Sequence, residues 1–444
     1  MTKFHPNVWY PFTILKEAPT PLKVTKGDGL WIELEDGRRI MDCISSWWVN
    51  TFGHAHPKIT KAITEQAEKL EHVIFANFTH EPAEKAAEMI SGALPGSLNR
   101  VFYSDDGSTA VEVAMKMAYQ YWINKGQQRK TFICFEAAYH GDTFGAMSAG
   151  ERSVFTNVFQ DLLFDVEFVP FPETWMDDEG VEDREDAIID KIESLLEKKP
   201  GEYAGIMIEP LVQGAGGMRM CRESFLKKLK KIADERDTLM IYDEVMTGFG
   251  RTGDWFACNR AEVEPDIICM AKGITGGFLP LSATVASDEI YDTFNSNDPQ
   301  KTFWHGHSYT ANPLGCAAAI ASCELMEEYQ PVYSKMEQWH REHLSDLADH
   351  PRLERLRALG TISAMNIDTS GRDVSVDPYT SEVLRDEDGY LNSVADAIKK
   401  RCVDKGLLLR PLGNVLYLMP PYCTTRDQLA EMYEGIVELL DEIG

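Results

Sequence analysis

Residues 239–245, Leu-Met-Ile-Tyr-Asp-Glu-Val, decide the fold, because an apolar run here ends directly in two carboxylates. A run that is apolar at every position predicts a strand buried on both faces, as in a parallel sheet covered by helices. The stretch 266–273, Asp-Ile-Ile-Cys-Met-Ala-Lys-Gly, has the same design and ends at Lys272. Both stretches therefore place charged side chains at the carboxyl end of a buried strand.

Similar apolar runs lie on either side of these two, separated by segments with helical periodicity. Further strands are predicted at 100–103, 131–135 and 203–208, and helices at 108–122 and within 177–199. This alternation over about residues 101–286 indicates an α/β fold with a mostly parallel central sheet and helices on both of its faces. Ligands bind outside the carboxyl ends of the strands in such sheets, so we expect the chemistry there.

The two ends of the chain differ from this pattern. Residues 1–49 contain short strand-like runs with turns, and the chain from 331 onward begins with a charged helix and ends in mixed strands and helices. We therefore expect a large domain of residues 50–330 and a smaller α+β domain built from residues 1–49 and 331–444.

Composition excludes several classes of protein. The 444 residues carry 44 Lys+Arg against 71 Asp+Glu, a net charge of -27, and no basic cluster that a nucleic acid would need. No window approaches the about 18 apolar residues that cross a bilayer, and the first residues lack the apolar core of a signal peptide. The nine cysteines are scattered without a CxxC pair, and no metal-ligand spacing is present. We expect a cytoplasmic protein without metal, nucleic-acid or membrane partners.

Three further features follow predicted strands. Lys272 comes after an apolar run, and a desolvated lysine has a lowered pKa and can act as a nucleophile, although most lysines are simply solvated. Gly107 and Ser108 open a predicted helix, where backbone N–H groups can bind a phosphate. An ordinary helix cap by Ser108 is the simpler interpretation of that motif alone. Tyr139 begins the polar turn Tyr-His-Gly-Asp142.

Other interpretations of single motifs are less consistent with their surroundings. Asp243 and Glu244 end a strand as a Walker B motif does, but the chain contains no Gly-Lys dipeptide and therefore no P-loop. Residues 248–253 match GxGxxG, yet no helix pattern opens inside them, so we interpret them as a turn. His305 and His307 lack an evident third metal ligand.

Taken together, the features match the needs of pyridoxal 5′-phosphate. Lys272 would attach the cofactor covalently, and Asp243 would keep its pyridine nitrogen protonated. Tyr139 would stack on the ring, and the helix that begins near Gly107 would bind the phosphate.

From about Val8 to the C-terminus the chain resembles the fold-type I, class III aminotransferases. The resemblance rests on five local sequences: Trp-Tyr-Pro-Phe at 9–12, Ser-Ser-Trp-Trp at 45–48, Tyr-His-Gly-Asp-Thr-Phe-Gly-Ala-Met-Ser at 139–148, Val-Gln-Gly-Ala-Gly-Gly-Met-Arg-Met at 212–220 and Tyr-Leu-Met-Pro-Pro at 417–421. Within the family they are most similar to the biotin-pathway branch, which implies amino transfer to 8-amino-7-oxononanoate, giving 7,8-diaminononanoate.

The resemblance implies roles for the matching residues. Lys272 resembles the lysine that attaches the cofactor and then moves a proton, Asp243 the partner of the pyridine nitrogen, and Tyr139 the stacking aromatic. The other implied cofactor contacts are Gly107 and Ser108 at the phosphate, Val245 at the ring, and Ser308 from the second subunit of a homodimer. The implied substrate-pocket residues are Phe12, Trp47, Asp142, Arg251, Gly306 and Arg410, of which Arg410 grips a carboxylate.

Departures from family patterns bear on the substrates. Ornithine- and GABA-type relatives carry a glutamine where Met246 stands, which points away from them. Many members that use S-adenosylmethionine have a tyrosine in place of Phe12 and read His-Gly-Pro-Thr at 305–308, whereas this chain reads His-Gly-His-Ser and is similar to a branch that takes its amino group from lysine. The amino donor is therefore expected to be S-adenosylmethionine or lysine.

We accordingly expect a homodimeric enzyme, with its active site at the subunit interface, that acts on a small-molecule keto acid and an amino donor. One alternative keeps the cofactor but changes the substrate, to that of another ω-amine transaminase of ornithine, GABA or diamine type or of an aminomutase. A second alternative, a nucleotide-binding switch built on Asp243, Glu244 and the glycine turn, is weakened by the missing P-loop.

Overall fold

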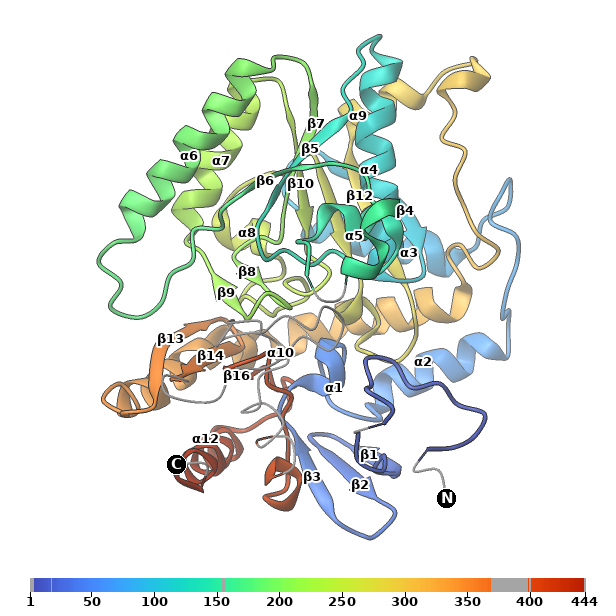
Figure 1. Ribbon diagram of the computed structural model, residues 1–444. Coiled ribbons are helices and arrows are strands. Elements are labelled where there is room, and N and C mark those ends of the chain that lie inside the picture. The colour runs from blue at the N-terminus through green and yellow to red at the C-terminus, as the bar shows by residue number, and fades with distance from the viewer. Residues whose placement is uncertain (1–3, 17, 154–155, 369–397, 399–400, 443–444) are drawn as a thin grey trace.

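A seven-stranded sheet with the order β4-β12-β11-β10-β7-β5-β6 forms the centre of the molecule. The computed structural model describes residues 4–16, 18–153, 156–368, 398 and 401–442 (Figure 1). The strands are β4 (Leu98–Ser104), β12 (Ser282–Ser287), β11 (Ile267–Met270), β10 (Leu239–Asp243), β7 (Tyr203–Ile208), β5 (Thr131–Phe135) and β6 (Glu167–Val169). β10 pairs in parallel with β11 and β7, whereas β12 pairs antiparallel with β11 and β4. The predicted α/β class with a mostly parallel sheet is confirmed, and the antiparallel strand is β12, next to the edge strand β4.

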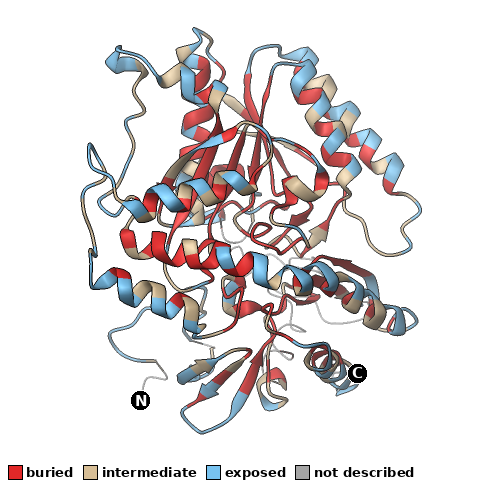
Figure 2. Cartoon of the chain, turned by 180° about the vertical axis from the view of Figure 1, so that it is seen from behind, coloured by how far each residue is buried: buried red, intermediate tan, exposed pale blue. Residues whose placement is uncertain are grey.

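Helices cover both faces of this sheet because successive residues of β10 point to opposite sides. Leu239 and Ile241 belong to the same buried cluster as the apolar side of α4 (Gly107–Asn124). Met240 and Tyr242 belong to the cluster that contains α6 (Val181–Lys198) and α7 (Glu223–Glu235). Figure 2 shows the result, with buried central strands and helices exposed only on their outer sides. The predicted helices at 108–122 and within 177–199 are both present.

Two smaller sheets contain the remaining long strands. The first has the order β1-β2-β3-β15, with β1 (Val24–Asp28), β2 (Trp31–Leu34), β3 (Arg39–Asp42) and β15 (Leu407–Leu408). Leu407 pairs in parallel with Met41, so segments from both ends of the chain lie side by side (Figure 1). The second sheet consists of β13 (Leu353–Leu359), β14 (Ile362–Ile367) and β16 (Val415–Leu418).

The helix α10 (Pro313–Asp346) is continuous through Pro331, where the sequence analysis placed a domain boundary. The division into residues 50–330 and the two terminal parts therefore stays a prediction. The other elements are α1 (Ser45–Trp48), α2 (Pro57–Ala67), α3 (Glu81–Ala93), α5 (Phe144–Ala149), η1 (Asn157–Leu162), β8 (Val212–Gln213), β9 (Arg219–Met220), α8 (Ala257–Ala261), η2 (Lys272–Thr275), α9 (Asp288–Phe294), η3 (Pro299–Lys301) and α12 (Arg426–Glu442).

Candidate active site

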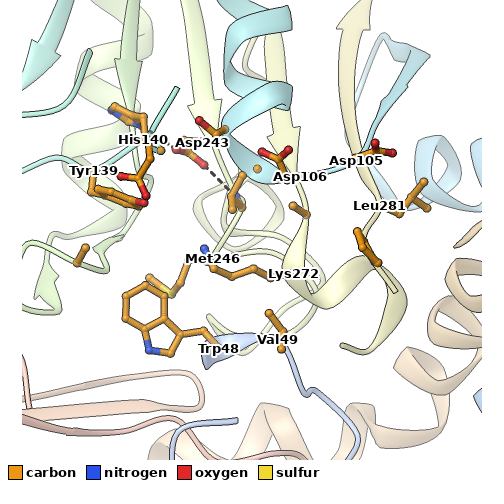
Figure 3. Close-up of a pocket in the computed structure, with 18 of the residues that line it drawn as sticks. Trp48, Val49, Asp105, Asp106, Tyr139, His140, Asp243, Met246, Lys272 and Leu281 are labelled. Carbon is orange, nitrogen blue, oxygen red and sulfur yellow. Dashed lines mark hydrogen bonds and ion pairs between the residues drawn. The ribbon is translucent and has the colours of Figure 1, made fainter. Parts of the chain in front are cut away.

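Two cavities meet at the carboxyl ends of the central strands. The strand-end cavity, of about 640 Å³, is lined by residues that follow β4, β5, β7, β10 and β11 (Figure 3). The arginine cavity, of about 620 Å³, is lined by Arg219, Arg355, Arg357 and Arg410 together with aromatic residues. The two cavities share Trp48, Val49, Tyr139, Ala215 and Lys272. Lys272 therefore stands where a ligand in one cavity would meet a ligand in the other.

The amine of Lys272 is held in surroundings that favour its neutral form. The residue follows β11 with a φ of 40°, a backbone conformation that side chains rarely adopt. Burial lowers the pKa of Lys272 and Arg251 lowers it further, while the charges of Asp243 and Glu209 oppose the shift. Its Nζ lies 5.3 Å from the centre of the Trp48 ring. A neutral buried amine is a nucleophile and a proton acceptor.

Asp243 ends β10 and is fixed by two donors. Its Oδ2 lies 2.7 Å from His140 Nδ1, and its Oδ1 accepts a hydrogen bond of 3.0 Å from the backbone N–H of Val245. Burial opposes protonation of His140, but the hydrogen bond and charge of Asp243 outweigh it and raise the pKa of His140. The protonated ring can donate a hydrogen bond to Asp243, so His140 acts as a positioning group for this carboxylate.

Glu209 is a third acid at the strand ends, which the sequence analysis missed. It follows β7, and its two carboxylate oxygens accept hydrogen bonds from the backbone N–H groups of Tyr139, at 3.0 Å, and Gly214, at 2.9 Å. Burial raises the pKa of Glu209 to about 7, and the charge of Asp243 adds to the shift. The signal was available, because Glu209 ends the apolar run 203–208 as Asp243 ends its own strand.

The N-terminus of α4 opens onto the strand-end cavity. Asp106, rather than Ser108, caps the helix by accepting from the backbone N–H of Thr109 at 3.0 Å. The backbone N–H groups of Gly107 and Ser108 have no acceptor among the described residues and line the cavity. A Cβ on Gly107 would lie 2.5 Å from Val245 Cγ1, so only glycine leaves this turn open. An 18-residue helix with free N–H groups at its start suits a phosphate.

Hydroxyl and carboxylate groups brace this helix start from the side. Thr143 Oγ1 donates to Glu112 Oε1 at 2.6 Å and lies 2.7 Å from Ser108 Oγ. Glu112 also accepts from the backbone N–H of Gly145 at 2.7 Å. The Ser108 hydroxyl is therefore held by a network that ends in a carboxylate.

Tyr139 and Asp142 come from the turn after β5, and both line the strand-end cavity. Tyr139 also lines the arginine cavity, and 38% of its surface is exposed. Burial and the charge of Asp142 raise the pKa of the Tyr139 hydroxyl, which therefore stays protonated at neutral pH. In Figure 3 the Tyr139 ring and the Trp48 ring lie on the same side of the site as His140 and Met246.

The arginine cavity begins with aromatic residues from the N-terminal part of the chain. The Phe12 and Trp47 rings meet edge to face with centres 5.5 Å apart, and the Arg410 guanidinium lies 4.7 Å from the centre of the Trp47 ring. Tyr417, in the wall of the arginine cavity, accepts a hydrogen bond of 3.0 Å from Nε1 of Trp48, which lines both cavities. A ligand here would contact apolar walls and a cation.

Three predicted site residues lie elsewhere in this chain. Arg251 is buried and donates to the carbonyl oxygens of Pro420, at 3.2 Å, and Trp48, at 3.3 Å. Gly306 and Ser308 are exposed in the loop before α10. None of the three is among the described residues that line either cavity. Arg251 therefore contacts the backbone of Trp48. Ser308 is exposed, as expected for a residue that contributes to the site of a second subunit, and that contribution stays a prediction.

The site also fits the chemistry of one cofactor closely. A buried lysine amine, a carboxylate held by histidine and a phosphate-binding helix start surround one cavity, as pyridoxal 5′-phosphate requires. Among the described residues no group of three or more His, Cys, Asp or Glu side chains could hold a metal ion. Nor does any helix in the described ranges have the length and apolarity to cross a membrane. The fold and site define a fold-type I, pyridoxal-phosphate-dependent class of enzyme.

Comparison with known proteins assigns the chain within that class. The family model for aminotransferase class-III matches residues 14–440. An adenosylmethionine-8-amino-7-oxononanoate aminotransferase of Synechococcus elongatus is 55% identical over 439 residues, 99% of each chain. A second, of Geobacter sulfurreducens, is 39% identical and covers 97% of this chain and 94% of its own. The chain belongs to the class III aminotransferase family.

Solved structures agree with this assignment. The crystal structure of the adenosylmethionine-8-amino-7-oxononanoate aminotransferase from Methanocaldococcus jannaschii superposes with a TM-score of 0.87 at 33% identity, covering 98% of this chain and 97% of that one. A pyridoxal-phosphate-bound amine transaminase from an uncultivated Pseudomonas species superposes with a TM-score of 0.88 at 27% identity over 100% of both chains. The predicted family and fold are confirmed.

Proposed function

We propose that this enzyme transfers an amino group to 8-amino-7-oxononanoate, giving 7,8-diaminononanoate, with pyridoxal 5′-phosphate as its cofactor. The observation that carries the proposal is the 55% identity to the Synechococcus elongatus enzyme over 99% of both chains. Lys272, Asp243 and the start of α4 around a single cavity support the cofactor.

The residues at the strand ends would hold the cofactor by its two ends. The backbone N–H groups of Gly107 and Ser108 would take the phosphate, and Asp243 would hold the pyridine nitrogen protonated, with Val245 and Tyr139 against the ring. When bound, pyridoxal 5′-phosphate supplies an aldehyde that takes up the amino group and a ring that accepts electrons from the adjacent carbon. His140 keeps Asp243 in place for that contact.

Lys272 moves the proton. Its Nζ, whose pKa is lowered by burial, would accept a proton from the substrate carbon that bears the amino group and return it on the cofactor side. The test is Lys272→Ala, with the exposed Lys61→Ala as a matched control. The variant should lose turnover completely while the control keeps it. Full transaminase turnover by purified Lys272→Ala would end this assignment.

The arginine cavity would receive the chain of the substrate. Arg410 would bind a carboxylate, and Phe12, Trp47 and Asp142 would form walls around the reacting carbon. Arg251 would act through its hydrogen bond to the carbonyl of Trp48 rather than by touching the substrate.

S-adenosylmethionine is the amino donor that the names of the relatives support. Lysine is the second candidate, because Phe12 lacks the hydroxyl that many adenosylmethionine-dependent members carry at this place. Mixing the holoenzyme with each compound separately and recording the cofactor absorbance decides between them, since only the true donor converts the cofactor in the absence of a keto acid.

We also propose a homodimer in which Ser308 and Gly306 complete the partner's site. The loop that carries them exposes Trp304 by 75% and Tyr309 by 62%, and large exposed aromatic side chains are typical of interfaces. Light scattering should give twice the chain mass of 50.1 kDa. A monomer with full activity would contradict the shared site.

The alternative function is that of an ω-amine transaminase with a different substrate. It is favoured by the likeness to the Pseudomonas amine transaminase at 27% identity. A panel of diamines, β-alanine and 8-amino-7-oxononanoate separates the two. If the amines react and 8-amino-7-oxononanoate does not, the proposed substrate is wrong, whereas the proposed cofactor is still supported.

A further inference from the structure

The end of the arginine cavity that lies against β13 and β14 carries an unusual buried cation. Arg357, on β13, is only 6% exposed, yet no carboxylate pairs with it in the described part of the chain. Buried charges are normally paired, because removing an ion from water costs several kcal/mol. Burial lowers the pKa of Arg357 to about 10, so the guanidinium still stays charged at neutral pH. A buried guanidinium without a carboxylate partner in a cavity wall suggests that an anionic ligand pairs with it there.

The hydrogen bonds of Arg357 are all made to neutral oxygens. Nε donates to the carbonyl of Met218 at 2.8 Å and Nη2 to that of Gly217 at 2.7 Å. Nη1 donates to the carbonyl of Arg355 at 2.6 Å and to Asn366 Oδ1 at 2.8 Å. A guanidinium has five N–H donors, so one N–H on Nη2 is left over.

Asn366, on the neighbouring strand β14, offers a second donor. Its Oδ1 is held by Arg357, which turns the amide nitrogen the other way. No hydrogen bond of that nitrogen is present within the described ranges, and both residues line the cavity. The remaining N–H of Arg357 and the amide N–H groups of the adjacent Asn366 are donors for the two oxygens of one carboxylate, and we call this pair of residues the fork.

The charge of the cavity wall points to the same ligand. In a chain with a net charge of -27, the described wall of this cavity carries four arginines, Arg219, Arg355, Arg357 and Arg410, against two acids, Glu151 and Glu173. Glu173 is already paired with Arg355 at 2.9 Å and lies 3.9 Å from Arg219. The wall therefore has cationic charge to spare where the rest of the protein is acidic, and it would attract an anion.

We infer that Arg357 and Asn366 form a carboxylate-binding fork that fixes the far end of the substrate in the arginine cavity, in addition to Arg410. The identity of the substrate in this inference rests on the proposed function. The recognition of a terminal carboxylate does not. A substrate with a terminal carboxylate would be selected over the same chain with an uncharged end.

The direct test uses an inert probe, so that it does not depend on which keto acid reacts. Octanoate and octanamide differ only in charge at the end of the chain, and both can be measured as competitive inhibitors of the holoenzyme with whichever amine it turns over. Octanoate should inhibit the unaltered enzyme more strongly. Arg357→Met should weaken octanoate at least tenfold and leave octanamide within twofold. Equal weakening of both compounds would show a structural role for Arg357 and overturn the inference.

A second variant covers the case in which Arg357→Met fails to fold, since Arg357 also ties β13 to residues 217–218. Asn366→Leu removes the amide donor and the Oδ1 that accepts from Arg357 Nη1, and it leaves the three backbone acceptors of Arg357 in place. It should weaken octanoate about threefold to tenfold with no change for octanamide. Arg426→Met, which removes an exposed arginine that lines neither cavity, is the control and should leave the preference for octanoate within twofold. An unchanged preference in Asn366→Leu would contradict the fork.

The substrate pair separates this inference from the proposed function. Arg357→Met should raise the KM for 8-amino-7-oxononanoate at least tenfold and change that for its methyl ester by less than threefold. If the unaltered enzyme does not accept 8-amino-7-oxononanoate at all, the proposed function is wrong. The comparison of octanoate with octanamide still tests whether Arg357 and Asn366 bind a carboxylate.

Discussion

His140 Nδ1 lies 2.7 Å from Asp243 Oδ2, and both residues are buried beyond the carboxyl ends of β5 and β10, two strands of the central sheet that β7 separates. The contact joins the turn after β5 to the end of β10, two elements about a hundred residues apart in the chain. The position of the Asp243 carboxylate, which we propose to hold the pyridine nitrogen, therefore depends on the contact with His140.

Replacing His140 by Leu should therefore impair catalysis without removing any reacting group. A charge-assisted hydrogen bond contributes about 1.5–3 kcal/mol, which corresponds to a roughly 10- to 150-fold loss in kcat if Asp243 loses its hold on the ring nitrogen. His140→Gln, which keeps an N–H donor, should recover part of the loss. The absorption maximum of the bound cofactor should shift in the Leu variant, and an unchanged spectrum together with normal kcat would refute the positioning role.

Gly107→Ala should weaken cofactor binding through a steric clash. The added Cβ would lie 2.5 Å from Val245 Cγ1, so the helix start or the ring contact must move. We expect the dissociation constant for pyridoxal 5′-phosphate to rise at least tenfold, measured by fluorescence titration of the apoenzyme. Gly92→Ala is the matched control, because a Cβ there meets nothing within 4 Å and alanine favours the helix by about 0.5–1 kcal/mol. Equal cofactor affinity in both variants would contradict the tight cradle.

Much of this site follows from one rule applied to the sequence. Asp243 and Lys272 stand out because each ends an apolar run, and parallel strands bring their carboxyl ends to one edge. The same rule applied to Glu209 would have added the third acid. The fold class follows for the same reason, since runs without alternation need helices on both faces.

Other features could not be read from local sequence, because they depend on contacts between distant segments. His140 gains its role from Asp243, and Asp106 takes the cap that Ser108 was expected to provide. Arg251 was expected at the pocket and instead donates to the carbonyl oxygens of Trp48 and Pro420, which are far from it in the sequence. Arg357 stands in an ordinary strand, and only its partners and the cavity distinguish it from a surface arginine.

Glu209→Gln should lower the pKa of Lys272. The charge of Glu209 raises the pKa of Lys272, and above pH 7, where Glu209 itself is ionised, removing that charge favours the neutral amine. The rate at which the apoenzyme captures the cofactor follows the neutral fraction of Lys272, so its midpoint on a pH scale should move to lower pH in the variant. Glu151→Gln, an exposed acid of the arginine cavity, is the control and should not move it. A midpoint that stays or rises would show that Glu209 does not act on Lys272.

His340 should make stability depend on pH, away from the active site. The ring is fully buried on α10, with its Nδ1 2.9 Å from the Tyr433 hydroxyl and its Nε2 3.3 Å from the carbonyl of Thr361. Burial lowers the pKa of His340 to about 3, below the usual value of 6.5 that it regains in the unfolded chain. Between these values the unfolded state binds the proton and the folded state does not, so the stabilisation is complete above pH 6.5 and is lost as the pH falls toward 3.

The loss attributable to His340 should be about 2 kcal/mol between pH 6.5 and pH 5, from 1.36 kcal/mol for each unit of pKa. His340→Gln cannot titrate, so the free energy of unfolding of this variant should fall less over the same interval. Urea unfolding of both proteins at pH 7.0, 6.0 and 5.0 measures the difference in slope and cancels the contributions of the carboxylates common to both. Parallel curves would mean that His340 keeps an ordinary pKa in the folded protein.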